Sequence, residues 1–171
     1  MNDSIEKVRR EMLAFCTGEP IIVTLSTTAE CFDEYNLLIF VRSISDYIPT
    51  YIQSVQLHLL LPIKHPDAAP IVKLYKTKLF HPNFSASGEW ADNVMRQDET
   101  IADYLMRLIR VLQFKEINAD KAADRNAMAW YNRNVGSKIF PTDRINYNVK
   151  PHISVKRINN APFSQRSIEV I

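Results

Sequence analysis

The sequence contains very little glycine, cysteine and net charge. Its 171 residues include three glycines and two cysteines, Cys16 and Cys31, and the formal net charge is +2. Two cysteines cannot form the disulfide framework of a small secreted domain, so we expect a reducing compartment. A net charge close to zero gives no electrostatic reason to bind nucleic acid, which needs a concentrated basic surface.

Long apolar stretches are also missing. No run approaches the roughly 20 apolar residues of a membrane-spanning helix, and no basic segment followed by an apolar one opens the chain. We therefore expect a cytoplasmic, soluble protein without a membrane partner. The apolar share of 46% and the charged share of 23% are those of an ordinary globular protein. The length suits one domain and a tail.

The pattern of apolar residues predicts an α+β fold. One helix is expected from Ile5 to Phe15 and another over 101–112, where Ile101, Leu105, Leu108, Ile109 and Leu112 form a stripe. Four runs of strand character lie between these helices, at 21–27, 36–41, 55–61 and 71–75. Because their connections are short and contain no helix, we expect a four-stranded antiparallel meander flanked by helices.

The stretch from His81 to Asp92 is the most informative part of the chain. It begins with His81-Pro82-Asn83, continues with small polar residues and reaches Gly88, which is turn chemistry between a strand and a helix. An ordered loop between two rigid elements is where functional residues tend to lie. A stiff loop with three prolines, 62–70, precedes the strand that enters it. On its own, His-Pro-Asn is also a common turn tripeptide.

Together these features resemble the ubiquitin-conjugating enzymes. The proline-rich loop, His81-Pro82-Asn83, Gly88, the helix over 101–112 and the segment 126–132 occur in the order found in that family. The resemblance covers roughly residues 5–134. It implies a ubiquitin-conjugating-enzyme-like domain over residues 1–135 and a C-terminal extension over 136–171 that is irregular or holds a short strand.

The resemblance also implies a role for position 91. In the family, the residue eight positions after the asparagine is the cysteine that carries ubiquitin as a thioester, and here that residue is Ala91. A methyl group can neither attack nor leave, so the chain as written cannot carry a thioester there. Asn83 would supply an oxyanion donor or order the loop, and His81 would hold the turn. Asp120 or Asp124 would gate the incoming lysine.

Partner-binding residues are implied in the same way. Lys7, Arg9 and Arg10 lie on one side of the first helix, which presents basic residues to the activating enzyme in this family. Without the resemblance, these three residues would be read as a solvated helix face. Asp67 stands where the family has an aromatic residue that contacts ligases, and the Ser-Pro-Ala that precedes the second helix in the family is missing.

Three interpretations follow. The chain is a conjugating-type enzyme whose nucleophile has been replaced by alanine, or a natural non-catalytic adaptor that binds a ubiquitin-like protein, or an unrelated α+β scaffold. The expected partners are a ubiquitin-like protein, an activating enzyme and a protein substrate, with no cofactor and no metal. Because both ligase-contact loops diverge, the chain looks less like the eukaryotic core members than like bacterial relatives encoded beside their own activating enzyme, some of them in antiviral defence operons.

Overall fold

The computed structural model describes residues 3–18, 21–28, 32–62 and 68–141. Along these segments the elements are α1 (Asp3–Gly18), β1 (Ile21–Thr28), β2 (Phe32–Ile39), β3 (Ser43–Ile44), β4 (Tyr51–Ile52), β5 (Val55–Pro62), β6 (Ile71–Leu74), α2 (Ile101–Leu112), the 3₁₀ helix η1 (Ala119–Lys121) and α3 (Arg125–Asn134). The predicted α+β class and antiparallel sheet are confirmed. No helix among these residues is long and apolar enough to cross a membrane.

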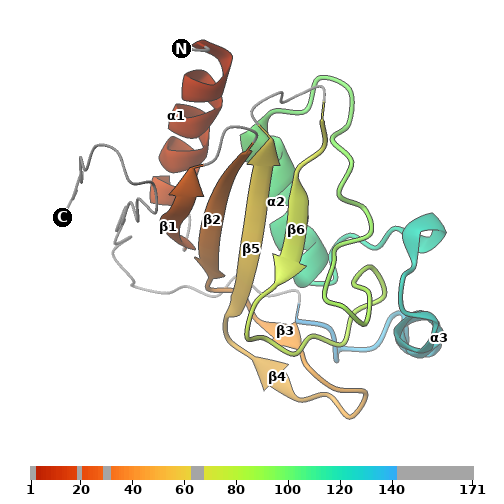
Figure 1. Ribbon diagram of the computed structural model, residues 1–171. Coiled ribbons are helices and arrows are strands. Elements are labelled where there is room, and N and C mark those ends of the chain that lie inside the picture. The colour runs from red at the N-terminus through yellow and green to blue at the C-terminus, as the bar shows by residue number, and fades with distance from the viewer. Residues whose placement is uncertain (1–2, 19–20, 29–31, 63–67, 142–171) are drawn as a thin grey trace.

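The main sheet has the strand order β1-β2-β5-β6, and each neighbouring pair is antiparallel. The chain leaves this sheet after β2, forms the small β3–β4 pair, and returns as β5 (Figure 1). The second run was predicted at 36–41, but β2 spans Phe32–Ile39. This boundary was wrong because the strand contains a buried aspartate, Asp33, whose carboxylate is neutralised by Arg9 from α1.

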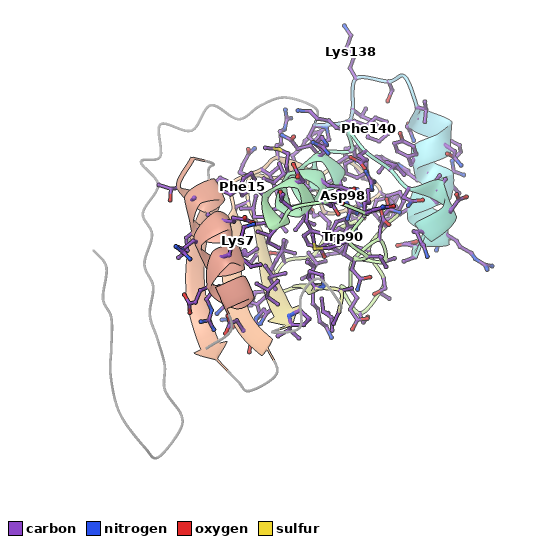
Figure 2. The ribbon with its side chains drawn as sticks, turned by 90° about the horizontal axis from the view of Figure 1, so that it is seen from above. Lys7, Phe15, Trp90, Asp98, Lys138 and Phe140 are labelled. Atoms are coloured by element: carbon purple, nitrogen blue, oxygen red, sulfur yellow. The ribbon has the colours of Figure 1, made fainter. Side chains whose placement is uncertain are left out.

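The main core lies between one face of this sheet and the helices α1 and α2. In β5 the alternate residues Val55, Leu57, Leu59 and Leu61 are fully buried, as their spacing predicted. The apolar stripe of α2 packs on this face, behind the sheet in Figure 1. Figure 2, seen from above, shows α1 beside α2 and α3 well apart from both.

Helix α2 has well-defined ends. Thr100 and Asp103 form a capping box, in which each side chain accepts a hydrogen bond from the backbone of the other residue. At the far end Phe114 adopts φ 57°, the left-handed conformation in which glycine is usual. A bulky residue is strained there. The strained turn places the Phe114 ring 4.5 Å, between centroids, from the ring of His81.

A second apolar cluster supports α3. Its buried members are Ile44, Phe114 and Trp130, and Phe140 packs against Trp130 with 5.6 Å between the ring centroids. The compact part of the chain therefore reaches at least Phe140. Residues 142–171 lie outside the described residues, and the predicted domain boundary at residue 135 stays a prediction.

Candidate functional site

His81 is a buried residue at the start of the loop formed by residues 81–92. Its side chain is fully enclosed, Nδ1 accepts the backbone N–H of Asn83 at 3.1 Å, and Nε2–H donates to the carbonyl of Val111 at 2.8 Å. These two bonds fix the tautomer with the proton on Nε2. Burial lowers the pKa of His81 from 6.5 to about 3, and the bond to Val111 opposes this only in part. His81 is therefore a neutral structural residue that holds the turn against α2.

The side chain of Asn83 joins the loop to the turn before α3. Nδ2 donates to the carbonyl of Asn118 at 2.5 Å and to that of Lys121 at 3.1 Å, while Oδ1 accepts the N–H of Asn118 at 3.0 Å. The residue is completely buried. Both amide protons are therefore used in holding the two segments together, which makes Asn83 an ordering residue in this conformation and leaves no proton for an oxyanion.

Ala91 lies at the end of a short strand-like segment. Residues 88–90 run antiparallel to β6: the N–H of Leu74 donates to Gly88 and the N–H of Trp90 donates to Val72. The N–H of Ala91 then donates to the carbonyl of Asn83 at 2.9 Å. Position 91 is half-buried and is fixed by the backbone on both the sheet side and the His-Pro-Asn side.

Gly88 is required for this arrangement. Its φ is +83°, and a Cβ atom built on it would lie 3.0 Å from Cβ of Leu74. Any other residue would be strained by its backbone conformation and would also press on β6.

The two acidic candidates differ in their surroundings. Asp120 is exposed at the start of η1. The carboxylate of Asp124 instead caps α3, because its Oδ1 accepts the N–H groups of Asn126 and Ala127. The carbonyl of Pro82 accepts from the N–H groups of Ala123 and Asp124, so the acidic turn is attached directly to the His-Pro-Asn turn. The structure thus brings Ala91, Asn83 and this acidic segment into one unit, with Asp120 as its exposed carboxylate.

The three basic residues of α1 do not form one exposed row. Lys7 is 75% exposed and lies 3.8 Å from Glu11, and Arg10 is exposed. The guanidinium of Arg9, however, donates two hydrogen bonds to buried Asp33, at 2.6 and 2.8 Å, and these bonds raise the already high pKa of Arg9 further. The prediction that all three residues share one exposed side of α1 is therefore wrong for Arg9. Its side chain is instead used to neutralise the buried carboxylate of Asp33.

Other sequence candidates lie away from the loop. Asp67 and Cys31 lie outside the described side chains. Cys16 is buried in the core on α1, so its thiol is not part of the candidate site. His58 sits in β5 with Nδ1 2.7 Å from Glu34, and among the described residues no group of three His, Cys, Asp or Glu side chains could hold a metal ion.

Sequence reasoning missed the residue that holds the other side of position 91. Arg107 of α2 is fully buried, and its guanidinium contacts Asp92, Val94 and Glu99, which belong to the segment that follows Ala91. A signal was available: position 107 is three residues after Tyr104 and four before Val111, both of which are buried on the same helix. Figure 2 labels Trp90, which precedes this segment in sequence, and Asp98, which belongs to it.

Comparison with known proteins adds no family assignment. No family model matches the sequence, and no curated protein matches it. Any chemical role of this chain therefore has to come from the residues of the loop itself. The geometry can fix a residue at position 91 beside an acidic turn, but the methyl group of Ala91 can supply neither a nucleophile nor a proton.

Proposed function

We propose that this chain is a ubiquitin-conjugating-enzyme-like protein in which alanine occupies the position of the nucleophile. With a thiol at position 91, such a protein accepts a ubiquitin-like modifier from an activating enzyme and passes it to an amine. The observation that supports this best is the backbone bond from Ala91 to Asn83 together with the side-chain bonds from Asn83 to Asn118 and Lys121. These bonds fix position 91 relative to His-Pro-Asn and to the acidic turn.

The chemistry of this function requires a thiolate. The sulfur attacks the thioester carbonyl of the modifier on the activating enzyme, a new C–S bond forms, and the enzyme's own thiolate leaves. A substrate amine then attacks the carried thioester and gives up a proton to water. As the tetrahedral intermediate collapses, the C–S bond breaks and the sulfur at position 91 leaves as a thiolate. Asp120 is the exposed carboxylate of the acidic turn to which Asn83 is bonded, and it is suited to orient the amine of an incoming lysine.

A natural adaptor is the second candidate. One observation favours it: both amide protons of Asn83 are engaged by carbonyl groups, so the residue has a use that does not depend on catalysis. An adaptor would keep the ordered loop as a binding surface for the modifier and would need no thiol. In this reading Asp120 and the exposed α1 residues Lys7 and Arg10 contribute contacts only.

Restoring the thiol separates the two candidates. The Ala91→Cys protein should be incubated with ATP, a ubiquitin-like protein and the activating enzyme from the same genome. We expect a conjugate on a non-reducing gel that disappears on addition of a reducing thiol. Ala86→Cys is the matched control, because it places a thiol at an exposed position of the same loop and should not be charged.

The outcomes are distinct. A thiol-sensitive conjugate with Ala91→Cys but not with Ala86→Cys supports the enzyme. Binding of the modifier by both proteins without any conjugate supports the adaptor. Neither binding nor conjugation contradicts both candidates and leaves the unrelated scaffold.

A further inference from the structure

We propose that Arg107 is the positioning residue of the candidate site. It holds the segment 92–99 and thereby fixes the direction in which position 91 faces. This inference rests on the proposed function only in taking position 91 as the reactive one. The contacts of Arg107 are a property of the fold itself, so they can be tested without a modifier or an activating enzyme.

All five N–H groups of the guanidinium have an acceptor. Nε donates to Oε1 of Glu99 at 2.8 Å and Nη2 to Oε2 of the same residue at 2.9 Å. Nη1 donates to the carbonyl of Asp92 at 2.8 Å and to its Oδ2 at 3.2 Å, and Nη2 also donates to the carbonyl of Val94 at 2.9 Å. A guanidinium has five donors, so Arg107 has none left for a ligand. It acts by positioning and not by touching a reacting group.

Arg107 also contacts aromatic residues, one of which lies on the N-terminal side of Ala91. The guanidinium carbon lies 4.8 Å from the ring centroid of Trp90 and 5.2 Å from that of Tyr104. Trp90 directly precedes Ala91 and Asp92 directly follows it. Arg107 therefore contacts both sequence neighbours of the candidate position, and a change in its place would move that position from both sides.

A stabilising role alone does not account for a buried arginine here. Removing a guanidinium and two carboxylates from water is costly, and an apolar residue of similar size often fills such a site equally well. The segment 92–99 contains no helix or strand, so the carbonyls of Asp92 and Val94 need a donor from elsewhere. Arg107 supplies that donor and selects one conformation of an otherwise irregular segment.

The charge state of the cluster suits this task. Burial acts to raise the pKa of Glu99, but hydrogen bonds from Arg107 and from the backbone N–H of Arg96 hold it below its ordinary value. For Arg107, burial acts to lower the pKa, and Glu99 and Asp92 outweigh it. Glu99 and Arg107 therefore both remain charged at neutral pH, which keeps their ion pair in place.

The test uses the Ala91→Cys protein as the parent and adds Arg107→Met, Arg107→Lys or Arg110→Met. Methionine has a side chain of similar length but no hydrogen-bond donors. Lysine keeps the positive charge but lacks the planar, forked arrangement of N–H donors of the guanidinium. Arg110→Met is the matched control, because Arg110 lies on the same helix but is exposed and pairs with Glu116. Amide hydrogen exchange is followed by segment, and iodoacetamide alkylation of the peptide that contains position 91 is followed over pH 6–10.

We expect Arg107→Met to speed exchange in residues 92–99 by about tenfold or more while the sheet stays protected. In the same Arg107→Met variant, the rate of alkylation at position 91 or the pH at which alkylation is half-maximal should also change. Arg107→Lys should restore part of both, and Arg110→Met should leave both unchanged. If charging by an activating enzyme is observed, Arg107→Met should lower its maximal rate and leave half-saturation by that enzyme unchanged.

Two results would overturn the inference. One is unchanged exchange and alkylation in a folded Arg107→Met protein; the other is faster exchange throughout the sheet, which would show a purely global role. If Arg107→Met does not fold, the same measurements on Glu99→Gln decide, because that variant removes one charge from the cluster and keeps its shape. A protein that is never charged but shows the local effect contradicts the proposed function and not this inference.

Discussion

Residues 81–90 and residues 92–99 lie on the two sides of position 91, and different interactions hold them. The first segment is fixed by neutral hydrogen bonds from His81 and Asn83 and by backbone pairing with β6. The second is fixed by the ionised cluster of Arg107, Glu99 and Asp92. A short turn can satisfy its polar groups locally, whereas an irregular segment needs donors from a distant element.

The difference predicts different responses to acid. Above pH 6.5 His81 is neutral in both the folded and the unfolded chain. Below that pH the unfolded chain binds a proton that the buried ring excludes down to about pH 3, so the free energy of unfolding falls with pH. The expected loss is about 1.4 kcal/mol per pH unit, or about 3 kcal/mol by pH 4, measurable by urea denaturation.

The stability contributed by the ion pairs of the segment 92–99 should be lost only at lower pH. The pKa of Glu99 is held below 4.5 in the folded protein, so its contribution is present above pH 4.5 and is lost only as the pH falls through the lowered value. Between pH 6.5 and 4.5 a His81→Gln variant should therefore lose most of the pH dependence. An equal slope in that variant would show that His81 is not the group responsible.

Removing the amide of Asn83 tests the neutral side directly. Asn83→Ala leaves the N–H of Asn118 and two carbonyl groups without their partner, and we expect a loss of about 2–3 kcal/mol in the free energy of unfolding. Asn126→Ala, at an exposed position of α3, is the control and should change little. If the two variants unfold at the same urea concentration, the bridge between the segments does not contribute to stability.

The smallest expected effect separates backbone strain from contact in the turn. Gly88→Ala should cost about 1–2 kcal/mol, because φ is +83° and the new Cβ atom would meet Leu74. Gly136 has φ +84° with no atom within 4 Å of the added Cβ, so Gly136→Ala reports the strain alone. Thermal unfolding of both proteins measures the difference, and equal melting temperatures would show that β6 yields to the added methyl group.

Much of the segment 81–90, which neutral hydrogen bonds hold, could be predicted from the sequence. Turn residues, Gly88 and the strand and helix on each side are local signals, and the alternation in β5 and the stripe of α2 identified the buried faces. The positions of His81 and Asn83 in the turn followed from neighbours close in sequence. Their hydrogen-bond partners, Val111, Asn118 and Lys121, lie 30 or more residues away and could not be deduced from spacing.

The burial of Arg107 was missed for a related reason, although its spacing to Tyr104 and Val111 places it on the buried face of α2. A charged residue on a helix normally faces solvent, and Arg107 is buried only because Asp92 and Glu99 arrive from another segment to neutralise it. The same reason explains the error at Arg9, whose buried partner Asp33 comes from β2. In both cases an ion pair with a residue of another segment buries a basic side chain that its charge alone would place in solvent.

The pairing of residues 88–90 with β6 has a consequence for self-association. β6 is the last strand of the main sheet in the order β1-β2-β5-β6, and the exposed edge of such a strand is a template for aggregation with other chains. The bonds from Leu74 to Gly88 and from Trp90 to Val72 occupy backbone groups on that edge. The loop that presents position 91 therefore also shields the sheet, so damage to the loop would expose a surface that recruits further copies of the chain.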